Sequence, residues 1–170
     1  ELEWWSKYSN NIDWYNNFSR TIINKVSPLI DITHDTNIFE IGSGASGGIT
    51  YLNSNNKHAI DPLENYFSTR KQWIAQRDNR VKYYSGKGEN LPFKDSFFDL
   101  VTIDNVLDHC ETPIDVLNEI NRVITFGGII FFRQNIYNYW GSLMRYFMEL
   151  FRIDKGHPFT FRKCQLENYF

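Results

Sequence analysis

Cysteine is scarce in this chain, because its 170 residues include only Cys110 and Cys164. The two do not form a CxxC pair, and no cluster of His and Cys has the short spacing that metal ligands need. The sequence therefore contains neither a disulfide framework nor a zinc-binding pattern. We expect both cysteines to be free thiols and the protein to hold no metal ion.

Long apolar runs are missing as well. No stretch reaches the roughly 18 apolar residues that a membrane-spanning helix requires. The chain also does not open with a charged and then apolar leader. These absences predict no integral membrane association and, as the simplest interpretation, a cytoplasmic protein.

An excess of positive charge is also missing, since 18 Lys and Arg stand against 20 Asp and Glu and give a net charge of −2. Proteins that bind nucleic acids usually carry a clustered basic surface. The balance therefore argues against a nucleic-acid partner and favours a small ligand. The chain does contain 42% hydrophobic residues, enough for one globular domain with a core.

The order of apolar and glycine-rich segments predicts an α/β fold. Short apolar runs predict strands at residues 37–41, 58–60, 81–84, 97–103 and 129–132. Helical periodicity predicts helices at residues 64–76 and 113–124, and a further helix directly after the glycines of the first turn. Gly127 and Gly128 are expected to stop the helix at 113–124. This alternation is typical of a Rossmann-like three-layer sandwich with a mainly parallel sheet of at least five strands.

Three segments divide this single domain. Residues 1–31 are aromatic with helical spacing, residues 32–135 form the Rossmann-like ligand-binding core, and residues 136–170 are an aromatic helical segment without strands. The last segment suits a lid or a substrate wall. Ordinary core packing or a dimer face explains it equally well, so a homo-oligomer stays open.

Residues 42–47 read GSGASG, directly after the first expected strand, and fit the pattern GxGxxG. Such a turn offers unpaired backbone N–H groups to a ligand, although a tight turn that binds nothing has the same spacing. Asp61 ends the second strand, where a carboxylate accepts hydrogen bonds from ribose hydroxyls. A helix cap or a turn before Pro62 is the alternative for Asp61. Both features suit a nicotinamide-dependent reductase as well as other nucleotide-binding enzymes.

Four stretches decide between these classes: NIFEIGSGASGG from residue 37, HAIDPL from residue 58, GENLPFKDSFFDLV from residue 88, and VLDHCETPIDVLNEINRVITFGG from residue 106. With them the chain resembles the class I S-adenosylmethionine-dependent methyltransferases, in particular the type 11-like group that methylates small molecules such as quinones, sterols and sugars. The last two stretches are the specific ones, since a reductase has no reason to carry them. The resemblance implies a methyltransferase with S-adenosyl-L-methionine as cofactor and a small-molecule acceptor.

Residue roles follow from the resemblance one by one. Glu40 corresponds to the acid that helps to hold the methionine end of the cofactor, and Asp104 to the residue that faces the same moiety from the fourth strand. Asp61 corresponds to the ribose acid, while Gly88 and Glu89 would lie beside the adenine. The implied cofactor-binding residues are Glu40, Gly42, Ser43, Gly44, Asp61, Gly88, Glu89 and Asp104.

Two positions depart from the family pattern. Ser46 stands where a third glycine is common, and Lys87 stands where an Asp often contacts the adenine amino group. Lys cannot accept a hydrogen bond, so the adenine contact differs here. A non-enzymatic methyltransferase-like domain draws its support from these two departures, and an NAD(P)-dependent reductase draws its support from the GxGxxG pattern and Asp61.

A general base has two candidates. His109 follows the fourth strand and carries an imidazole that titrates near neutral pH, although a wall residue is the ordinary explanation for it. His157 is the second candidate, and it would equally serve to stabilise the segment that follows it.

The family's sheet has seven strands, and its last two form a hairpin over the edge of the fifth. This chain lacks a counterpart of that hairpin, which would leave an apolar edge strand exposed. We expect the natural protein to continue, or a partner chain to cover the edge.

Overall fold

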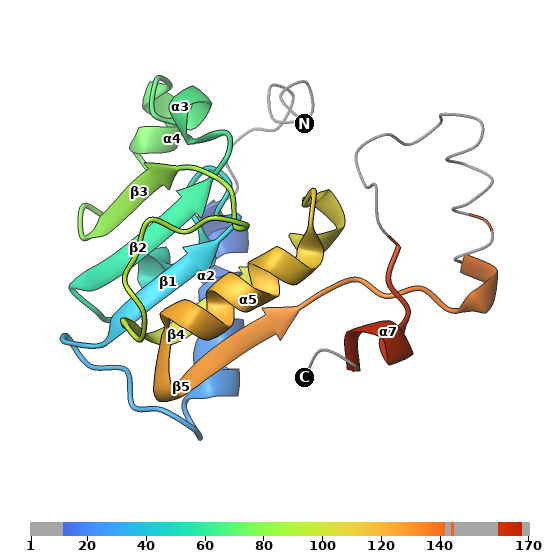
Figure 1. Cartoon of the computed structure of the whole chain (residues 1–170). Coiled ribbons are helices and arrows are strands. Elements are labelled where there is room, and N and C mark those ends of the chain that lie inside the picture. The colour runs from blue at the N-terminus through green and yellow to red at the C-terminus, as the bar shows by residue number, and fades with distance from the viewer. Residues whose placement is uncertain (1–11, 142–143, 145–159, 168–170) are drawn as a thin grey trace.

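The computed structural model describes residues 12–141, 144 and 160–167. Its centre is a five-stranded sheet in the order β3-β2-β1-β4-β5, in which all neighbouring strands run parallel. The strands are β1 (Asn37–Ile41), β2 (Asn56–Asp61), β3 (Val81–Ser85), β4 (Phe98–Asp104) and β5 (Ile124–Arg133). Figure 1 shows the arrangement. It confirms the expected Rossmann-like α/β class.

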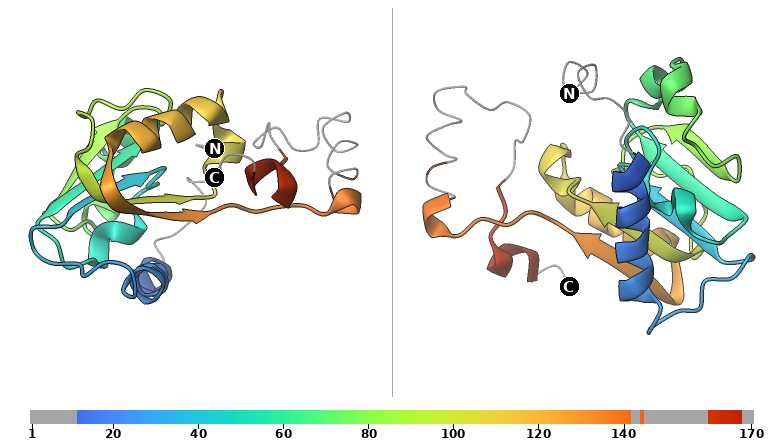
Figure 2. Two further views of the ribbon diagram at one scale, coloured as in Figure 1. Left: turned by 60° about the horizontal axis from the view of Figure 1, so that its bottom comes forward. Right: turned by 180° about the vertical axis from the view of Figure 1, so that it is seen from behind.

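Helices cover both faces of the sheet, as the two views of Figure 2 show. On one face α2 (Ile12–Val26) buries Phe18 and Ile22 against Ile38 of β1. On the other, α5 (Pro113–Val123) buries Val116 and its neighbours against the opposite side of the same strand. Both faces are thus apolar, which is why the strands read as continuous apolar runs rather than alternating ones.

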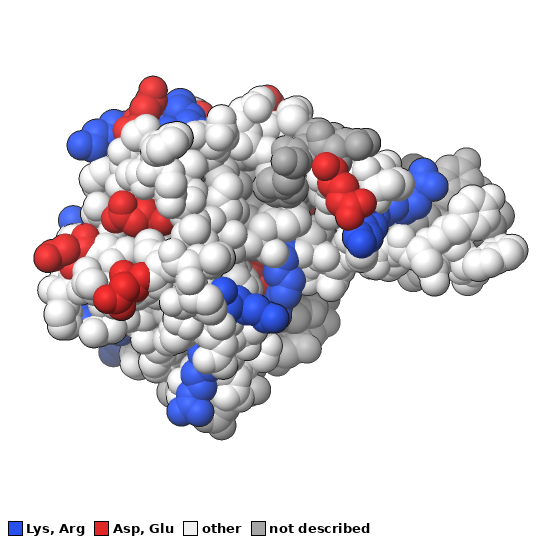
Figure 3. All heavy atoms as spheres, turned by 90° about the horizontal axis from the view of Figure 1, so that it is seen from below, with Lys and Arg blue, Asp and Glu red and all other residues white. Residues whose placement is uncertain are grey.

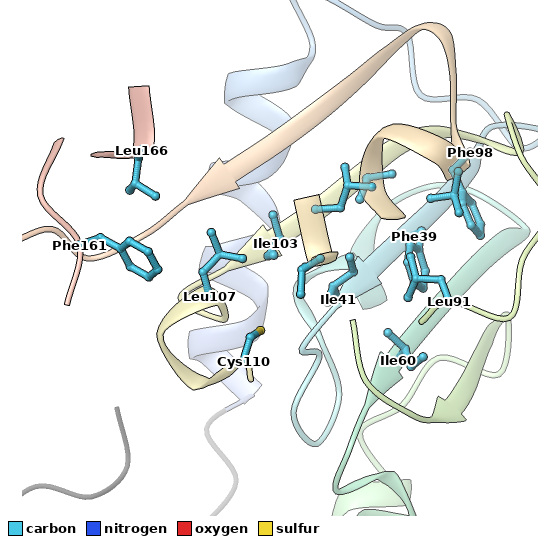
Figure 4. Packing of buried hydrophobic residues seen from close by; sticks show 14 residues of the cluster. Phe39, Ile41, Ile60, Leu91, Phe98, Ile103, Leu107, Cys110, Phe161 and Leu166 are labelled. Carbon is cyan, nitrogen blue, oxygen red and sulfur yellow. The ribbon is translucent and has the colours of Figure 1, made fainter. Parts of the chain in front are cut away.

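The described part of the C-terminal segment packs on the core. Phe161 and Leu166, the latter from α7 (Lys163–Glu167), join the buried cluster that contains Leu107 and Val116 (Figure 4). The N–H of Tyr137 donates to the carbonyl oxygen of Phe161 at 2.9 Å. Most of the expected aromatic helix after residue 141, and His157, lie outside the described residues. In the N-terminal segment the structure describes one helix, α2, which ends at Val26.

Two expected helices are shorter than the sequence indicated. After the glycines the chain makes only a single 3-10 turn, η1 (Gly48–Tyr51). The turn ends because Leu52 has extended backbone angles, and the ammonium of Lys57 donates to the carbonyls of Thr50 and Leu52 there. The helix expected at 64–76 is split into α3 (Glu64–Phe67) and α4 (Lys71–Ile74), because Arg70 between them has extended backbone angles.

The turn before β5 also differs from the expectation. Helix α5 ends at Val123, and Ile124 already has extended backbone angles and pairs with Phe98. Gly127 and Gly128 therefore do not stop the helix but lie within β5, at a register shift where Gly127 has a φ of 79°. Beyond the shift, Ile129 to Arg133 pair regularly with β4, as expected for residues 129–132.

The described residues contain no helix that is long and apolar enough to cross a membrane. Seen from below, the surface carries Lys and Arg side chains interspersed with Asp and Glu and separated by uncharged areas (Figure 3). No continuous basic surface is visible on that side. The two cysteines are free thiols, with Cys110 buried and Cys164 exposed.

Candidate functional site

Three acidic side chains lie at the carboxyl ends of three adjacent strands. Glu40 is the penultimate residue of β1, Asp61 is the last residue of β2, and Asp104 is the last residue of β4. Strand β1 lies between the other two in the sheet. Ligands of open parallel sheets bind outside such strand ends, and the Gly-rich loop of residues 42–47 begins at the same place.

Glu40 is buried, with 4% of its surface exposed. Its Oε1 accepts the N–H of Gly48 at 2.9 Å and its Oε2 accepts the N–H of Ile49 at 3.2 Å. Burial raises the pKa of Glu40 to about 7, the charges of Asp104 and Asp61 push in the same direction, and the two N–H groups counteract them. Near neutral pH a cation placed beside Glu40 would therefore shift its carboxyl group toward the ionised form.

Asp61 shapes the loop across from it. Its Oδ2 accepts the N–H of Gly44 at 2.8 Å, and its Oδ1 accepts the N–H of Leu63 at 2.8 Å. The side chain thereby joins the Gly-rich loop to the turn that leaves β2. A carboxylate oxygen can accept more than one hydrogen bond, so these contacts are compatible with a ligand hydroxyl at the same group.

The loop glycines are required by space as well as by backbone angles. Gly42, Gly44 and Gly47 have φ values of 72°, 57° and 81°, which side chains rarely adopt. A Cβ on Gly42 would overlap the side chain of Val106, and one on Gly47 would overlap the carboxylate of Glu40. Glycine therefore lets the chain pass close to these two side chains.

The N–H groups at the start of the loop are not unpaired, contrary to the sequence expectation. Gly42 and Ser43 donate to the carbonyl of Ile60 at 2.9 and 3.4 Å, and Gly44 donates to Asp61. The parallel pairing of β1 and β2 continues one step into the loop and uses these donors. This part of the loop therefore allows a ligand to come close to the backbone, but its three N–H groups are already used within the protein.

Side chains that the sequence did not single out hold the rest of the loop. The carbonyl of Ala45 accepts from Nε of Arg77 at 2.8 Å, and the carbonyl of Ser46 accepts from the hydroxyl of Tyr83 at 2.7 Å. Tyr15 of α2 is buried beside them, and burial together with the charge of Glu40 raises the pKa of its hydroxyl. The aromatic spacing of residues 1–31 pointed to Tyr15 as a helix residue only.

Gly88 and Glu89 lie on the other side of β1, next to α5. A Cβ on Gly88 would come within 3.0 Å of Ile41 and 3.1 Å of Val116, which explains the glycine. Oε1 of Glu89 accepts the N–H of Glu111 at 2.8 Å, two residues before α5 begins. Lys87 is paired with the carboxylate of Glu111 at 2.5 Å. Glu89 thus braces the loop that precedes α5.

The carboxylate of Asp104 forms an ion pair with Arg133. Its two carboxylate oxygens accept from Nε and Nη2 of Arg133 at 2.5 Å each, and the same guanidinium lies 4.6 Å from the ring centre of Phe18. This group links the ends of β4 and β5 to α2. A hollow of about 580 Å³ begins beside Arg133 at the end of β5, lined also by Phe132, Ile136 and α7.

His109 is exposed and closes the short turn η2 (Leu107–His109) after β4. The turn is braced by Gln134, whose Nε2 donates to Asp108 at 2.9 Å and whose Oε1 accepts the N–H of Leu107 at 3.2 Å. The structure thus brings His109 to the same edge of the sheet as Asp104. Among the described residues no group of three or more His, Cys, Asp or Glu could hold a metal ion.

Comparison with known proteins gives one family match. The family model of a methyltransferase domain matches residues 39–132, more than half of the chain. The chain is 32% identical over 106 residues to a demethylmenaquinone methyltransferase of Geobacillus sp., covering 55% of this chain and 45% of that protein. It is 25% identical over 127 residues to the thiol S-methyltransferase TMT1B of Rattus norvegicus, covering 72% and 52%. The chain spans about half the length of these curated relatives.

Solved structures share the fold. The YcgJ protein of Bacillus subtilis superposes with a TM-score of 0.70 at 18% identity, over 90% of this chain and 65% of that one. A protein of Thermotoga maritima described as a SAM-dependent methyltransferase and possible histamine N-methyltransferase superposes with a TM-score of 0.62 at 21% identity, over 92% and 70%. At these identities the likeness concerns the arrangement of strands and helices.

Proposed function

This chain belongs to the methyltransferase-domain family, and from that premise we propose that it binds S-adenosyl-L-methionine and transfers the methyl group to a small-molecule acceptor. Membership confirms the class I methyltransferase resemblance of the sequence, and S-adenosyl-L-methionine is the cofactor of that family. The observation that carries the proposal is the group of three acids, Glu40, Asp61 and Asp104, at the ends of adjacent strands around a Gly-rich loop.

The residues of the site fit this cofactor by charge. The cofactor bears a sulfonium and an ammonium group, and a buried carboxylate is stabilised in its ionised form by a cation nearby. Burial, with a contribution from the charges of Asp104 and Asp61, raises the pKa of Glu40 to about 7, so a cationic ligand beside it would shift the carboxyl group toward its ionised form. Asp104 has part of its charge balanced by Arg133 already. Glu40 is therefore the acid we assign to the methionine end.

Shape supports the same assignment. Asp61 closes β2 beside the loop and presents a carboxylate for the ribose hydroxyls, while Gly42, Ser43 and Gly44 let the backbone come close. On the other side of β1, Gly88 and Glu89 are assigned to the adenine end. Lys87 cannot accept a hydrogen bond from the adenine amino group, and it is held by Glu111 instead.

Positioning accounts for most of the catalysis that this chain must provide. When bound, the cofactor would supply a methyl group on a positively charged sulfur: an acceptor atom would attack the methyl carbon in line, and the electron pair of the breaking carbon–sulfur bond would leave with the sulfur. Fixing two reactants in the reactive geometry can contribute about 7 to 11 kcal/mol to the barrier reduction. A general base adds about 10² to 10⁴-fold. His109, exposed at the end of β4, is the candidate we propose for that secondary role.

Calorimetric titration tests the proposal. The folded protein is titrated with S-adenosyl-L-methionine and with S-adenosyl-L-homocysteine, and NADH is added in a parallel fluorescence titration. We expect binding of the first two and none of NADH. If neither sulfur compound binds at millimolar concentration while circular dichroism shows a folded protein, the proposal fails, and binding of NADH would instead favour a reductase.

A further inference from the structure

Behind the Gly-rich loop, on the side of β3, lies the guanidinium of Arg77. Its Nη1 and Nη2 donate to the two carboxylate oxygens of Glu64 at 2.8 and 2.6 Å, and its Nε donates to the carbonyl of Ala45 at 2.8 Å. Both side chains of the ion pair are only 9% exposed. Such a two-pronged Arg–carboxylate pair is directional, so the third donor of Arg77 has a fixed direction toward the loop.

Tyr83 of β3 adds a second contact to the same loop. Its hydroxyl donates to the carbonyl of Ser46 at 2.7 Å, and its ring lies beneath the guanidinium of Arg77, 3.9 Å from the ring centre. The hydroxyl of Thr50 donates to the same carbonyl at 2.6 Å. Two successive carbonyls of the loop are therefore held by side chains that stack on each other.

We propose that Arg77 and Tyr83 are positioning residues that set the affinity for the cofactor by fixing the loop, without contacting the cofactor themselves. The inference rests on the proposed function. A peptide group is planar and trans, so a carbonyl held in one direction also fixes the N–H of the next residue in the opposite direction. Fixing the carbonyls of Ala45 and Ser46 thus sets the orientation of the peptide groups that lead to Gly47.

Fixing the loop affects binding because the loop is rich in glycine. The loop has three glycines with positive φ, and glycine loses more conformational freedom on ordering than any other residue. A loop that had to be ordered by its ligand would subtract that entropy from the binding free energy, whereas a loop ordered in advance does not. Arg77 and Tyr83 order it from the protein side.

The ion pair also keeps the loop in register with Asp61. Glu64 starts α3, just after the turn whose Leu63 N–H is held by Asp61. Arg77 therefore connects the loop at Ala45 with the turn at Glu64, while Asp61 connects the same two segments at Gly44 and Leu63. Two parallel links hold the loop and the assigned ribose acid at a constant separation.

The test compares Arg77→Met, Arg77→Lys and Tyr83→Phe with the control Arg80→Met. Arg80 lies three residues from Arg77, and its guanidinium pairs with the carboxylate of Asp78 rather than with the loop. Three quantities are measured: the dissociation constant of S-adenosyl-L-homocysteine by calorimetry, the melting temperature, and amide hydrogen exchange of residues 42–49 by mass spectrometry. Exchange and binding together separate loop positioning from a general loss of stability.

We expect Arg77→Met to weaken binding by about tenfold and Tyr83→Phe by about threefold, in line with the loss of one charged and one neutral hydrogen bond. Amide exchange of residues 42–49 should rise in both, and Arg77→Lys should recover part of the affinity. Arg80→Met should leave affinity and loop exchange as in the wild type. If Arg77→Met does not fold because Glu64 is left unpaired, Arg77→Met/Glu64→Met removes both charges, and Tyr83→Phe stands beside it.

Equal affinity of the wild type, the Arg77 variants and Tyr83→Phe, with a change in melting temperature only, would overturn the inference and leave the proposed function intact. The inference is equally lost if Arg80→Met weakens binding as much as Arg77→Met. Faster loop exchange without a change in affinity would overturn it too, because the loop would then be held without any benefit to binding. If the wild type binds neither sulfur compound, the proposed function and this inference fall together.

Discussion

The backbone N–H of Gly44 donates to Oδ2 of Asp61 at 2.8 Å, so the carboxylate assigned to the ribose is also part of the loop's own structure. Its second oxygen holds the N–H of Leu63 at 2.8 Å. A buried side chain with two such bonds serves the fold before any ligand arrives. Substitutions at Asp61 therefore change two properties, and the two can be separated by the choice of the new residue.

Asp61→Asn and Asp61→Ala should differ in stability more than in binding. Asn keeps one carbonyl oxygen for a backbone N–H, whereas Ala leaves the N–H groups of Gly44 and Leu63 without their acceptor. Losing such bonds in a buried place lowers the free energy of unfolding by about 1 to 3 kcal/mol. We expect this loss for Ala, a smaller one for Asn, and weak cofactor binding for both. Urea denaturation measures the free energy of unfolding, and calorimetry measures the affinity for the cofactor. Wild-type affinity in Asp61→Ala would contradict the assignment of Asp61 to the ribose.

The pH dependence of binding should report Glu40, whose pKa burial raises to about 7. A cationic ligand favours the ionised carboxylate, so affinity for S-adenosyl-L-methionine should rise by about tenfold from pH 6 to pH 8. Glu40→Gln, which has no charge to gain, should bind weakly with a flat profile over that range. Calorimetry at pH 6, 7 and 8 gives both profiles, and a flat wild-type profile would count against the role of Glu40.

The same pKa predicts the opposite trend for the stability of the ligand-free protein. Between the ordinary pKa of 4.5 and about 7, the folded state keeps a proton on Glu40 that the unfolded state has released. The contribution of Glu40 to the free energy of unfolding therefore falls as pH rises through this interval, by about 3 kcal/mol in total. Urea denaturation of the wild type and Glu40→Gln at pH 5 and pH 8 measures it. A wild-type loss no larger than that of Glu40→Gln would contradict the raised pKa.

The sheet and the acids at its strand ends could be predicted because they depend on local patterns. Residues such as Ile38 and Phe39 lie on opposite faces of β1, and both faces are covered by helices, so the strand shows as an uninterrupted apolar run. Asp61 and Asp104 follow such runs directly, and parallel strands bring their ends to one edge. The sequence order alone therefore placed these acids together.

The contacts that hold the loop could not be predicted, because they join residues far apart in sequence. Arg77 and Ala45 are separated by 32 positions, and Tyr83 and Ser46 by 37. Carbonyl acceptors leave no trace in the sequence, since every residue has one. A helix after the loop was expected, but its restriction to one turn could not be predicted, because Leu52 has extended backbone angles and the ammonium of Lys57 on the next strand holds the carbonyls of Thr50 and Leu52.

Gly47→Ala should reduce both stability and cofactor affinity, and Gly127→Ala, at a glycine with positive φ away from the site, is its control. Both glycines have a positive φ, 81° and 79°, so an added Cβ strains the backbone at both positions. At Gly47 the ψ of 154° adds to the cost, because this combination of angles is nearly exclusive to glycine. Only Gly47 also has a side chain in the way, the carboxylate of Glu40, while a Cβ on Gly127 meets nothing within 4 Å. We therefore expect a larger loss in the free energy of unfolding for Gly47→Ala than for Gly127→Ala, from the backbone angles and the overlap with Glu40 together. If both variants bind the cofactor equally well, the close approach at Gly47 is not needed for the site.

Lys57→Met should destabilise the protein although it lies away from the proposed ligand. The ammonium of Lys57 is fully buried and donates to the carbonyls of Thr50 and Leu52 at 2.8 and 2.9 Å and to Oδ2 of Asp78 at 2.7 Å. Burial would raise the pKa of Asp78, but hydrogen bonds from Arg80 and Lys57 hold it well below the usual range.

Removing one partner of a buried ion pair costs about 3 to 5 kcal/mol. Arg80 still compensates Asp78 in this variant, so we expect a loss at the lower end of that range, measured by urea denaturation. Lys71→Met is the control, because Lys71 is exposed at the start of α4 and should change the free energy of unfolding by less than about 0.5 kcal/mol. Equal stability of the two variants would mean that the short turn after the Gly-rich loop is held by its packing alone.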